Sequence, residues 1–326
     1  MIVQLVDIDS KIPNFALMKV STYHKSKGDI VSLDYLINPD MVYISCIFKK
    51  NKKLAASCAY LYKKMYPNAQ IDIGGPGYDL YKKLPDKIEC QMPDYDLYPD
   101  IDYSMGFTTR GCIRNCPFCI VPIKEGKYKK ICSIETIHNP KFDKIKLLDN
   151  NILANKDNFR EVAKYCLRNN LKLDISQGLD ARLMDEEVAA LLAKIKPMSC
   201  FCFAFDSLKY KKDVIHTIDL LKSAGVNIRH KVQFYVYCDN DTLGEYGFNS
   251  ALERCRILKE EGTNPYVMLN IDTTPSVQMK HLKRWANRKH IFWTCDFNDY
   301  LKSRKFVEGE DRTLLTSIFD FAPKIA

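Results

Sequence analysis

The sequence predicts an α/β protein whose sheets are mainly parallel. Three observations predict this class. Short apolar stretches alternate with longer amphipathic ones along most of the chain, the alternation contains no internal repeat, and 46% of the 326 residues are hydrophobic. This pattern is typical of parallel strands joined by helices that cover both faces of a sheet, and the length suits one large domain or two ordinary ones.

The first hundred residues predict a Rossmann-like domain. Helices are expected at residues 14–27 and 52–66, between short and mostly buried strands. The expected strands are IVQLVDI (2–8), DIVSL (29–33), MVYISCI (41–47) and AQIDIGG (69–75). The segment CQMPDYDLYPDIDY has two prolines and little periodicity, so we expect it to connect this domain, residues 1–98, to the next.

Residues 99–302 predict six or seven further β/α units. Helices are expected at 157–170, 185–195 and 212–225. The expected strands are SMGFTTRG (104–111), KIKLLDN (144–150), KLDISQG (172–178), CFCFAFD (200–206), KVQFYVYC (231–238), YVMLNID (266–272) and HIFWTC (290–295). A full or partial parallel barrel is the economical arrangement, with functional residues at the carboxyl ends of its strands. Residues 303–326 form a tail to which we assign no function.

Composition indicates the cellular compartment and the kind of partner. No apolar run approaches the roughly 20 residues that a membrane-spanning helix needs, and the N-terminus MIVQLVDIDSK has acidic residues where a secretion signal has basic ones. We therefore expect a cytoplasmic protein without a membrane partner, whose 13 cysteines stay mostly reduced. The net charge of +9 favours an anionic partner, although a solvated surface explains it equally well.

Three cysteines stand close together in the segment RGCIRNCPFCIVPIKEG. Cys112, Cys116 and Cys119 have the spacing C-x3-C-x2-C and directly follow the expected strand at 104–111. Thiolates are the usual ligands of a 4Fe-4S cluster, and three of them leave one iron open to an external molecule. The alternative is a zinc knuckle with a distant fourth ligand, but structural zinc sites usually contain two C-x2-C pairs, and no second pair is present.

This motif, with Phe118 before the last cysteine and β/α units behind it, resembles the radical S-adenosylmethionine (SAM) superfamily. The resemblance implies a partial (β/α)6-type barrel, one 4Fe-4S cluster on the three cysteines, and SAM bound to the open iron. It also implies a reductant such as flavodoxin or ferredoxin. The reduced cluster then cleaves SAM to methionine and a 5′-deoxyadenosyl radical, which abstracts hydrogen from the substrate. Phe118 is expected beside the adenine of SAM.

The resemblance implies further SAM contacts at the ends of later strands. Asp149, Asn150 and Asn151 follow the expected strand at 144–150, where the family places an acidic or amide-containing segment that receives the SAM amine. The same side chains are equally suited to cap a helix beginning near Asn155.

The next two strand ends carry candidates for the ribose and carboxylate of SAM and for the acidic residue that related enzymes have on the fourth strand. These candidates are Ser176, Gln177, Arg182 and Asp206. For Arg182 the competing interpretation is an ordinary loop salt bridge with Asp180 or Asp185. No further grouped cysteines indicate a second cluster, and Cys238 and Cys295 are expected to be isolated buried thiols.

The N-terminal segments IPNFALMKVSTYHKSKGDIV and IDIGGPGYDL resemble the cobalamin-binding domain that precedes the barrel in one subgroup of the family. The D-x-H-x-x-G motif of that domain is absent, and His24 is the only histidine before the cysteines. A degenerate domain that shapes the active-site entrance is the favoured interpretation. Cobalamin binding, with a cobalamin-dependent methyltransferase activity, is the alternative; methylthiolation is a more distant one, because Cys46, Cys58 and Cys90 do not reproduce its cysteine pattern.

The substrate is weakly indicated. Two basic stretches, residues 124–130 and 283–289, favour a nucleotide or nucleic acid, with Trp285 and Trp293 available to stack on bases; a solvated face is the alternative. Two interpretations without catalysis remain open: a metal-braced nucleic-acid-binding module and a scaffold that has lost its activity. The sequence does not indicate which residues act on the substrate.

Overall fold

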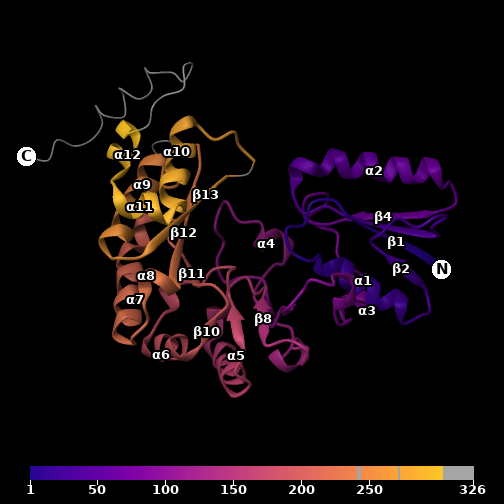
Figure 1. Ribbon diagram of the computed structural model, residues 1–326, viewed down its shortest axis with the longest axis horizontal. Helices are drawn as coiled ribbons and strands as arrows, with labels where there is room; N and C mark the ends of the chain where they lie inside the picture. Colours follow the sequence, from indigo (N-terminus) through magenta and orange to yellow (C-terminus); the bar gives the residue numbers. More distant parts are fainter. Residues whose placement is uncertain (241–243, 271, 304–326) are drawn as a thin grey trace, which may run out of the picture. The chain divides into compact units, whose positions relative to one another are not determined.

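The computed structural model describes residues 1–240, 244–270 and 272–303 (Figure 1). The protein is of the mixed α/β class with parallel sheets, as predicted. The chain divides into two compact units, one of residues 1–202 with 223–226 and one that begins with residues 203–222 and resumes at 227. The boundary predicted near residue 98 lies inside the first unit and stays a prediction.

The first unit begins with a four-stranded parallel sheet in the order β2-β1-β3-β4. Its strands are β1 (Ile2–Asp7), β2 (Ile30–Ser32), β3 (Met41–Ser45) and β4 (Gln70–Gly74), and its main helices are α1 (Phe15–Lys25) and α2 (Lys52–Met65). All four strands and both helices occur where the sequence predicts them.

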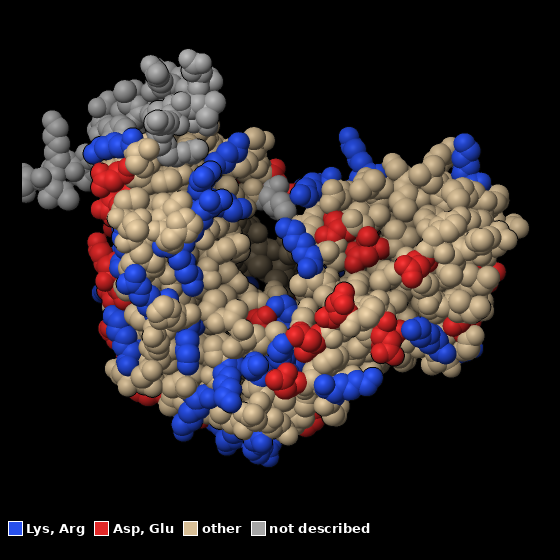
Figure 2. All heavy atoms as spheres, viewed as in Figure 1, with Lys and Arg blue, Asp and Glu red and all other residues tan. Residues whose placement is uncertain are grey.

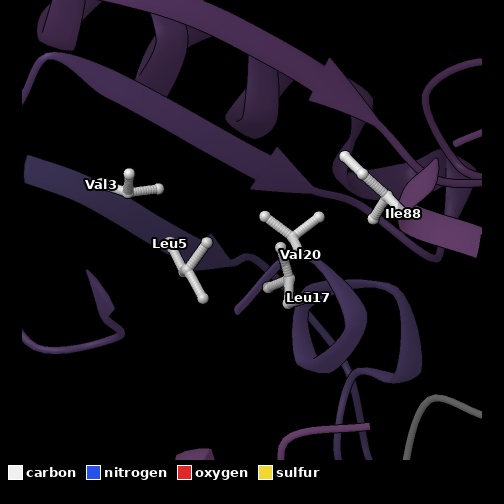
Figure 3. Close-up of a cluster of buried hydrophobic side chains, with 5 residues drawn as sticks. All are labelled: Val3, Leu5, Leu17, Val20 and Ile88. Carbon is white, nitrogen blue, oxygen red and sulfur yellow. The ribbon is translucent and has the colours of Figure 1, made fainter. Parts of the chain in front are cut away.

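Helices cover both faces of this sheet, which explains why its central strands β1 and β3 are mostly apolar. On one face, Val3 and Leu5 of β1 pack with Leu17 and Val20 of α1 and with Ile88 of the short helix α3 (Asp86–Glu89) (Figure 3). On the other face, Val42 and Ile44 of β3 pack with Ala55 of α2. Asn14 begins α1 by accepting a hydrogen bond from the Leu17 amide.

A second parallel sheet of the first unit has the order β10-β9-β8-β5. It consists of β5 (Ser104–Gly106), β8 (Lys144–Leu147), β9 (Lys172–Asp174) and β10 (Lys196–Pro197), with α5 (Lys156–Arg168) after β8 and α6 (Glu186–Lys194) after β9. The single strand predicted at 104–111 is two strands. After β5 the chain forms β6 (Thr109–Arg110), which pairs antiparallel with β7 (Lys129–Lys130) and not with the parallel sheet.

A three-stranded sheet in the order β11-β12-β13 belongs to the second unit from Phe203 onward. Its strands are β11 (Phe201–Ala204), β12 (Val232–Cys238) and β13 (Asn264–Leu269). Its helices are α7 (Lys211–Ser223), α8 (Ile228–Lys231), α9 (Phe248–Glu260), α10 (Val277–Asn287), α11 (Lys289–Thr294) and α12 (Phe297–Ser303). The rings of Phe203 and Phe234 stack between β11 and β12 with their centroids 5.3 Å apart, so they are core aromatics.

The strand predicted at residues 290–295 is wrong, because this segment is the helix α11. A short, largely apolar segment can form either a buried strand or a buried helix. Over six residues, the hydrophobic pattern does not distinguish between the two. Tertiary packing decides the outcome here. Phe292 is fully buried with its ring centroid 4.8 Å from that of Trp285, and Trp293 points elsewhere and donates from Nε1 to Asn264 Oδ1 at 3.0 Å.

Throughout the described ranges, every helix is either too short or too polar to cross a membrane.

Candidate functional site

The three predicted metal ligands lie on one loop that leaves β6 and returns through α4 (Val121–Lys124) to β7. Register pairs Thr109 with Lys130 and Arg110 with Lys129, and an isolated bridge joins Cys112 to Lys127. The loop is therefore closed at its stem by backbone pairing. Cys112, Cys116 and Cys119 are half-buried, and Cys119 N donates to Cys116 O at 3.0 Å in the turn between them.

Gly111 allows the two sides of this stem to approach closely. Its φ is +77°, in the left-handed region that favours glycine. A Cβ atom at this position would lie 2.3 Å from the Lys127 carbonyl oxygen and 2.6 Å from that of Gly126. The position immediately before the first cysteine therefore requires glycine for both reasons.

Asp149 lies at the carboxyl end of β8, and its carboxylate forms hydrogen bonds to the chain between β5 and β6. Its carboxylate accepts hydrogen bonds from the backbone amides of Thr108 (2.7 Å) and Thr109 (3.0 Å) and from the hydroxyls of both. Burial raises the pKa of Asp149, and these hydrogen bonds only partly offset that effect. With four donors already on it, Asp149 is a structural clamp.

The next two residues continue this contact along the cysteine loop. Asn150 Oδ1 accepts from the Gly111 amide at 3.0 Å, and Asn151 Nδ2 is 3.7 Å from the sulfur of Cys112. Asn151 Nδ2 also donates to Asp180 Oδ2 at 3.4 Å. Its Oδ1 is buried and has no hydrogen-bond partner among the residues that the structure describes.

The alternative that these residues cap the following helix is not what the structure contains. Asn155 is the N-cap of α5, and its side chain accepts from the Asn158 amide at 3.0 Å. Asn151 precedes a short 3-10 helix, Ile152–Ala154, without a capping hydrogen bond from its side chain.

Asp180 connects the cysteine loop to the segment after β9. It accepts from Arg182 Nε at 2.7 Å and Nη2 at 3.1 Å, and from Arg114 Nε at 2.9 Å. Arg114 stands between the first two cysteines, whereas Arg182 forms the loop salt bridge that was the competing interpretation of its role. Burial opposes ionisation of Asp180, but the two guanidinium groups outweigh it, and the pKa of this carboxyl lies below its ordinary value.

Sequence reasoning missed this position of Asp180 and the role of Arg114. The available signal was an arginine inside the C-x3-C spacing, which needs an anionic partner if it is not solvated. The fold shows that this partner is Asp180, which follows β9. The strands β8 and β9 are parallel neighbours, so their carboxyl ends lie at the same edge of the sheet.

Of the other predicted SAM contacts, Phe118 belongs to the cysteine loop, and Ser176, Gln177 and Asp206 lie on later segments of the chain. Ser176 accepts from Lys146 Nζ at 3.3 Å, beside the ion pair of Lys146 with Asp174. Gln177 is exposed. Phe118 is half-buried within the loop itself. Asp206 belongs to the second unit, where its Oδ1 accepts from the Tyr237 amide at 3.0 Å.

An ion-pair chain joins the loop stem to the N-terminal sheet region. The Arg110 guanidinium contacts Glu125 Oε2 at 2.9 Å at the end of the loop and Glu89 Oε1 in α3, and it lies 4.0 Å above the Phe107 ring. Lys19 of α1 reaches the same Glu89 oxygen at 3.1 Å. Arg110 therefore fixes the start of the loop to α3 and, through Glu125, joins the two ends of the loop.

The donor types suit a thiolate-ligated iron-sulfur cluster, because three thiols occur on one loop. Their present arrangement is not a formed metal site. In the described part of the chain, no group of three or more His, Cys, Asp or Glu side chains is positioned to hold a metal ion. The residues fit the cluster in kind, and loading one would require the loop to bring its three sulfur atoms together.

Two features of the N-terminal sheet bear on cobalamin. His24 is buried, with Nδ1 2.7 Å from Asp29 Oδ2 and Nε2 3.1 Å from the Tyr43 hydroxyl, so both ring nitrogens are engaged inside the fold. A Cβ atom on Gly75 would lie 2.3 Å from the Cys46 carbonyl oxygen. Close backbone packing therefore explains this glycine without a ligand.

The basic stretches differ from the expectation in one respect. Trp285 is fully buried and donates from Nε1 to Cys295 O at 3.1 Å, so it is not available to stack on a base. The neighbouring cations at 283, 284, 288 and 289 are exposed. In the other stretch, Lys127 and Lys129 are exposed, whereas Lys124 is half-buried, donates to Lys82 O at 3.0 Å, and has its pKa lowered by burial.

Comparison with known proteins adds no assignment. The chain matches no protein-family model, and no curated protein matches it significantly.

Proposed function

We propose that the protein is a radical SAM enzyme in which Cys112, Cys116 and Cys119 ligate one 4Fe-4S cluster with an open iron. In this proposal residues 99–302 form a partial (β/α)6-type barrel. The cluster and SAM supply the electron transfer and the abstraction of hydrogen from the substrate. The chain supplies the position of the loop, the contacts to SAM and the exclusion of water.

The observation that supports this proposal most is the state of Asn151. Its amide nitrogen points to the Cys112 sulfur, and its buried oxygen lacks a donor within the described residues. An unsatisfied buried acceptor costs about 1–3 kcal/mol, and native proteins rarely leave one without a reason. The cationic amine of a ligand bound beside Cys112 would satisfy it.

The neighbouring residues have supporting roles in this proposal. Asp149 and Asn150 hold the strand end and the loop stem, so that Cys112 starts from a fixed position. Asp180 holds Arg114 and Arg182 together beside the loop. Two guanidinium groups at this place would attract the carboxylate of the same ligand.

For the N-terminal sheet we propose a Rossmann-like domain that shapes the entrance of the site and is degenerate with respect to cobalamin. The internal hydrogen bonds of His24 and the packing of Gly75 support this choice over a cobalamin-dependent methyltransferase.

Anaerobic reconstitution tests the proposal. The purified chain is supplied with iron, sulfide, dithionite and SAM, and 5′-deoxyadenosine is measured by mass spectrometry. Wild type should form it, and alanine at any one of the three cysteines should abolish it. Cys132→Ala is the matched control, because this thiol is two residues beyond β7 and donates to the Phe107 carbonyl. Bound metal without cleavage of SAM would favour the metal-braced binding module instead.

A further inference from the structure

Two cysteine thiols meet at the start of β11. Cys200 directly precedes this strand and Cys202 lies within it, so both side chains are on the same face. Their sulfur atoms are 3.8 Å apart, and Cys202 Sγ is also 3.9 Å from the Cys200 carbonyl oxygen. Cys202 is buried and Cys200 is half-buried. A small molecule in solution therefore reaches the pair through Cys200.

The backbone spacing of this pair allows a disulfide but strains it. Residues two apart in an extended strand have Cα atoms about 6.4–6.8 Å apart. This separation is at the upper end of the range of about 4.4–6.8 Å that disulfides usually span. Strained disulfides are reduced easily and are the ones that serve reversible or regulatory chemistry. The pair is therefore suited to reversible oxidation and not to a permanent crosslink.

The chain that leads to the pair is basic. No acidic residue occurs from Val188 to Phe205, whereas Lys194 and Lys196 are both exposed. Figure 2 shows basic side chains over the region where Figure 1 places α5 and α6. Positive charge favours the thiolate, which is the form of cysteine that attacks a disulfide.

A series of contacts leads from the pair to the first cysteine of the loop. The Cys202 carbonyl oxygen accepts from the Leu179 amide at 2.7 Å. The next residue, Asp180, accepts from Arg114 Nε at 2.9 Å, and the Arg114 amide donates to Cys112 Sγ at 3.3 Å. A disulfide would shorten the start of β11 and displace this carbonyl group. It would therefore loosen the first contact of the series.

We propose that Cys200 and Cys202 are a redox-active dithiol that exchanges with small-molecule disulfides and, when oxidised, loosens the Asp180 contact to the cysteine loop. Cys200 attacks one sulfur of the small disulfide, whose S–S bond breaks and releases one thiol. Cys202 then attacks the Cys200 sulfur and releases the second thiol. The protein thiols are oxidised to a disulfide, the small disulfide is reduced, and the two thiol protons pass to the released thiols. As a regulation of the cluster loop, the inference rests on the proposed function, but its chemistry needs neither cluster nor SAM.

Glutathione is the probe that tests this proposal. The full chain, reduced and without added iron, is equilibrated with mixtures of reduced and oxidised glutathione, and the remaining thiols are alkylated. Mass spectrometry should find the peptide that contains Cys200 and Cys202 without alkylation and lighter by two hydrogens. Hydrogen exchange at the Leu179 amide should become about tenfold faster than in the reduced chain.

Cys166 is the matched control within the same chain. It is a buried thiol, and its carbonyl oxygen accepts from the Leu171 amide at 2.8 Å, as that of Cys202 does from Leu179. Cys166 should remain a thiol, and exchange at Leu171 should not change.

A double variant, Cys200→Ser with Cys202→Ser, retains the loop thiols and so separates the effect of the pair from their oxidation. Exchange at Leu179 in this variant should not respond to glutathione. The proposal is overturned if the two wild-type thiols stay reduced or form only mixed disulfides with glutathione, or if Leu179 exchanges equally fast in both states. Each of these results would leave the proposed function standing, because cleavage of SAM is measured separately on the reconstituted chain.

Discussion

Asp149, Asn150 and Asn151 are adjacent in the chain and differ in how their side-chain hydrogen-bond acceptors are used. The first accepts four hydrogen bonds, the second holds the Gly111 amide, and the third retains an acceptor without a donor among the described residues. The sequence predicted the three as a group, because each is a polar residue at a strand end. It did not predict the division of roles, which depends on where the chain between β5 and β6 runs.

Asn151→Leu tests this division. The change keeps the size of the side chain and removes the amide, so the cluster should still load while SAM binds at least tenfold more weakly, which corresponds to about 1.4 kcal/mol. Titration of the reconstituted protein with SAM measures the effect. Asn169→Leu, at the exposed end of α5, is the control. Unchanged affinity in Asn151→Leu would remove Asn151 from the SAM site.

Asp180 predicts a dependence of stability on pH. Its pKa in the folded chain lies below the ordinary 3.8, so the stability it contributes is present above pH 3.8 and is lost as pH falls through the folded value. Asp180→Asn should lower the free energy of unfolding by about 1.5–3 kcal/mol at neutral pH, and this difference should shrink below about pH 4. Urea denaturation at several pH values measures it.

Asp143→Asn is the control for that experiment. Asp143 is exposed, and its ion pair with Lys172 is long, at 3.7 Å. The account of Asp180 is contradicted if the two variants lose equal stability, or if the loss in Asp180→Asn does not change with pH.

At the scale of elements, apolar periodicity predicted most strands and helices well. It was reliable where a strand is buried on both faces, as in β1 and β3, and where an amphipathic helix follows, as in α5. It failed for α11, where aromatic residues pack as a helix against Trp285. It also missed the break between β5 and β6, where the Asp149 carboxylate holds the backbone amides of Thr108 and Thr109.

Gly111 and Gly126 provide a matched pair on the cysteine loop. Both have a φ of +77°, but a Cβ atom meets nothing within 4 Å at Gly126 and meets two carbonyl oxygens at Gly111. Each alanine variant should lose about 1–2 kcal/mol from the positive φ, and Gly111→Ala should lose about 1–3 kcal/mol more from the clash. Thermal unfolding and iron content of the reconstituted variants measure this. Equal behaviour of the two variants would show that the stem does not constrain the loop.

At the scale of the whole molecule, the net charge of +9 is compatible with the predicted nucleotide or nucleic-acid substrate and equally with a solvated surface. Buried Trp285 removes one of the two expected stacking residues, so a bound nucleic acid would be held mainly by electrostatic attraction. The substrate is the least predictable part of the protein from sequence, because exposed lysines serve solubility and binding equally well.

Salt dependence tests this attraction. Binding of a single-stranded RNA should weaken as salt rises, with a slope of about −0.7 in log K against log salt for each phosphate contact. The double variants Lys127→Glu/Lys129→Glu and Lys283→Glu/Arg284→Glu, measured separately by fluorescence anisotropy, identify which stretch contributes. Binding that is insensitive to salt and to both variants would exclude an electrostatic interface.

The claim on which the functional account depends is that one iron of the cluster is open and is filled by SAM. Electron-nuclear double resonance on the reduced, reconstituted chain with 15N-labelled SAM tests it most directly. The account predicts about four iron and four sulfide per chain, with hyperfine coupling between the cluster and the methionyl nitrogen. Zinc in place of iron, or a cluster without that coupling in the presence of saturating SAM, would contradict it.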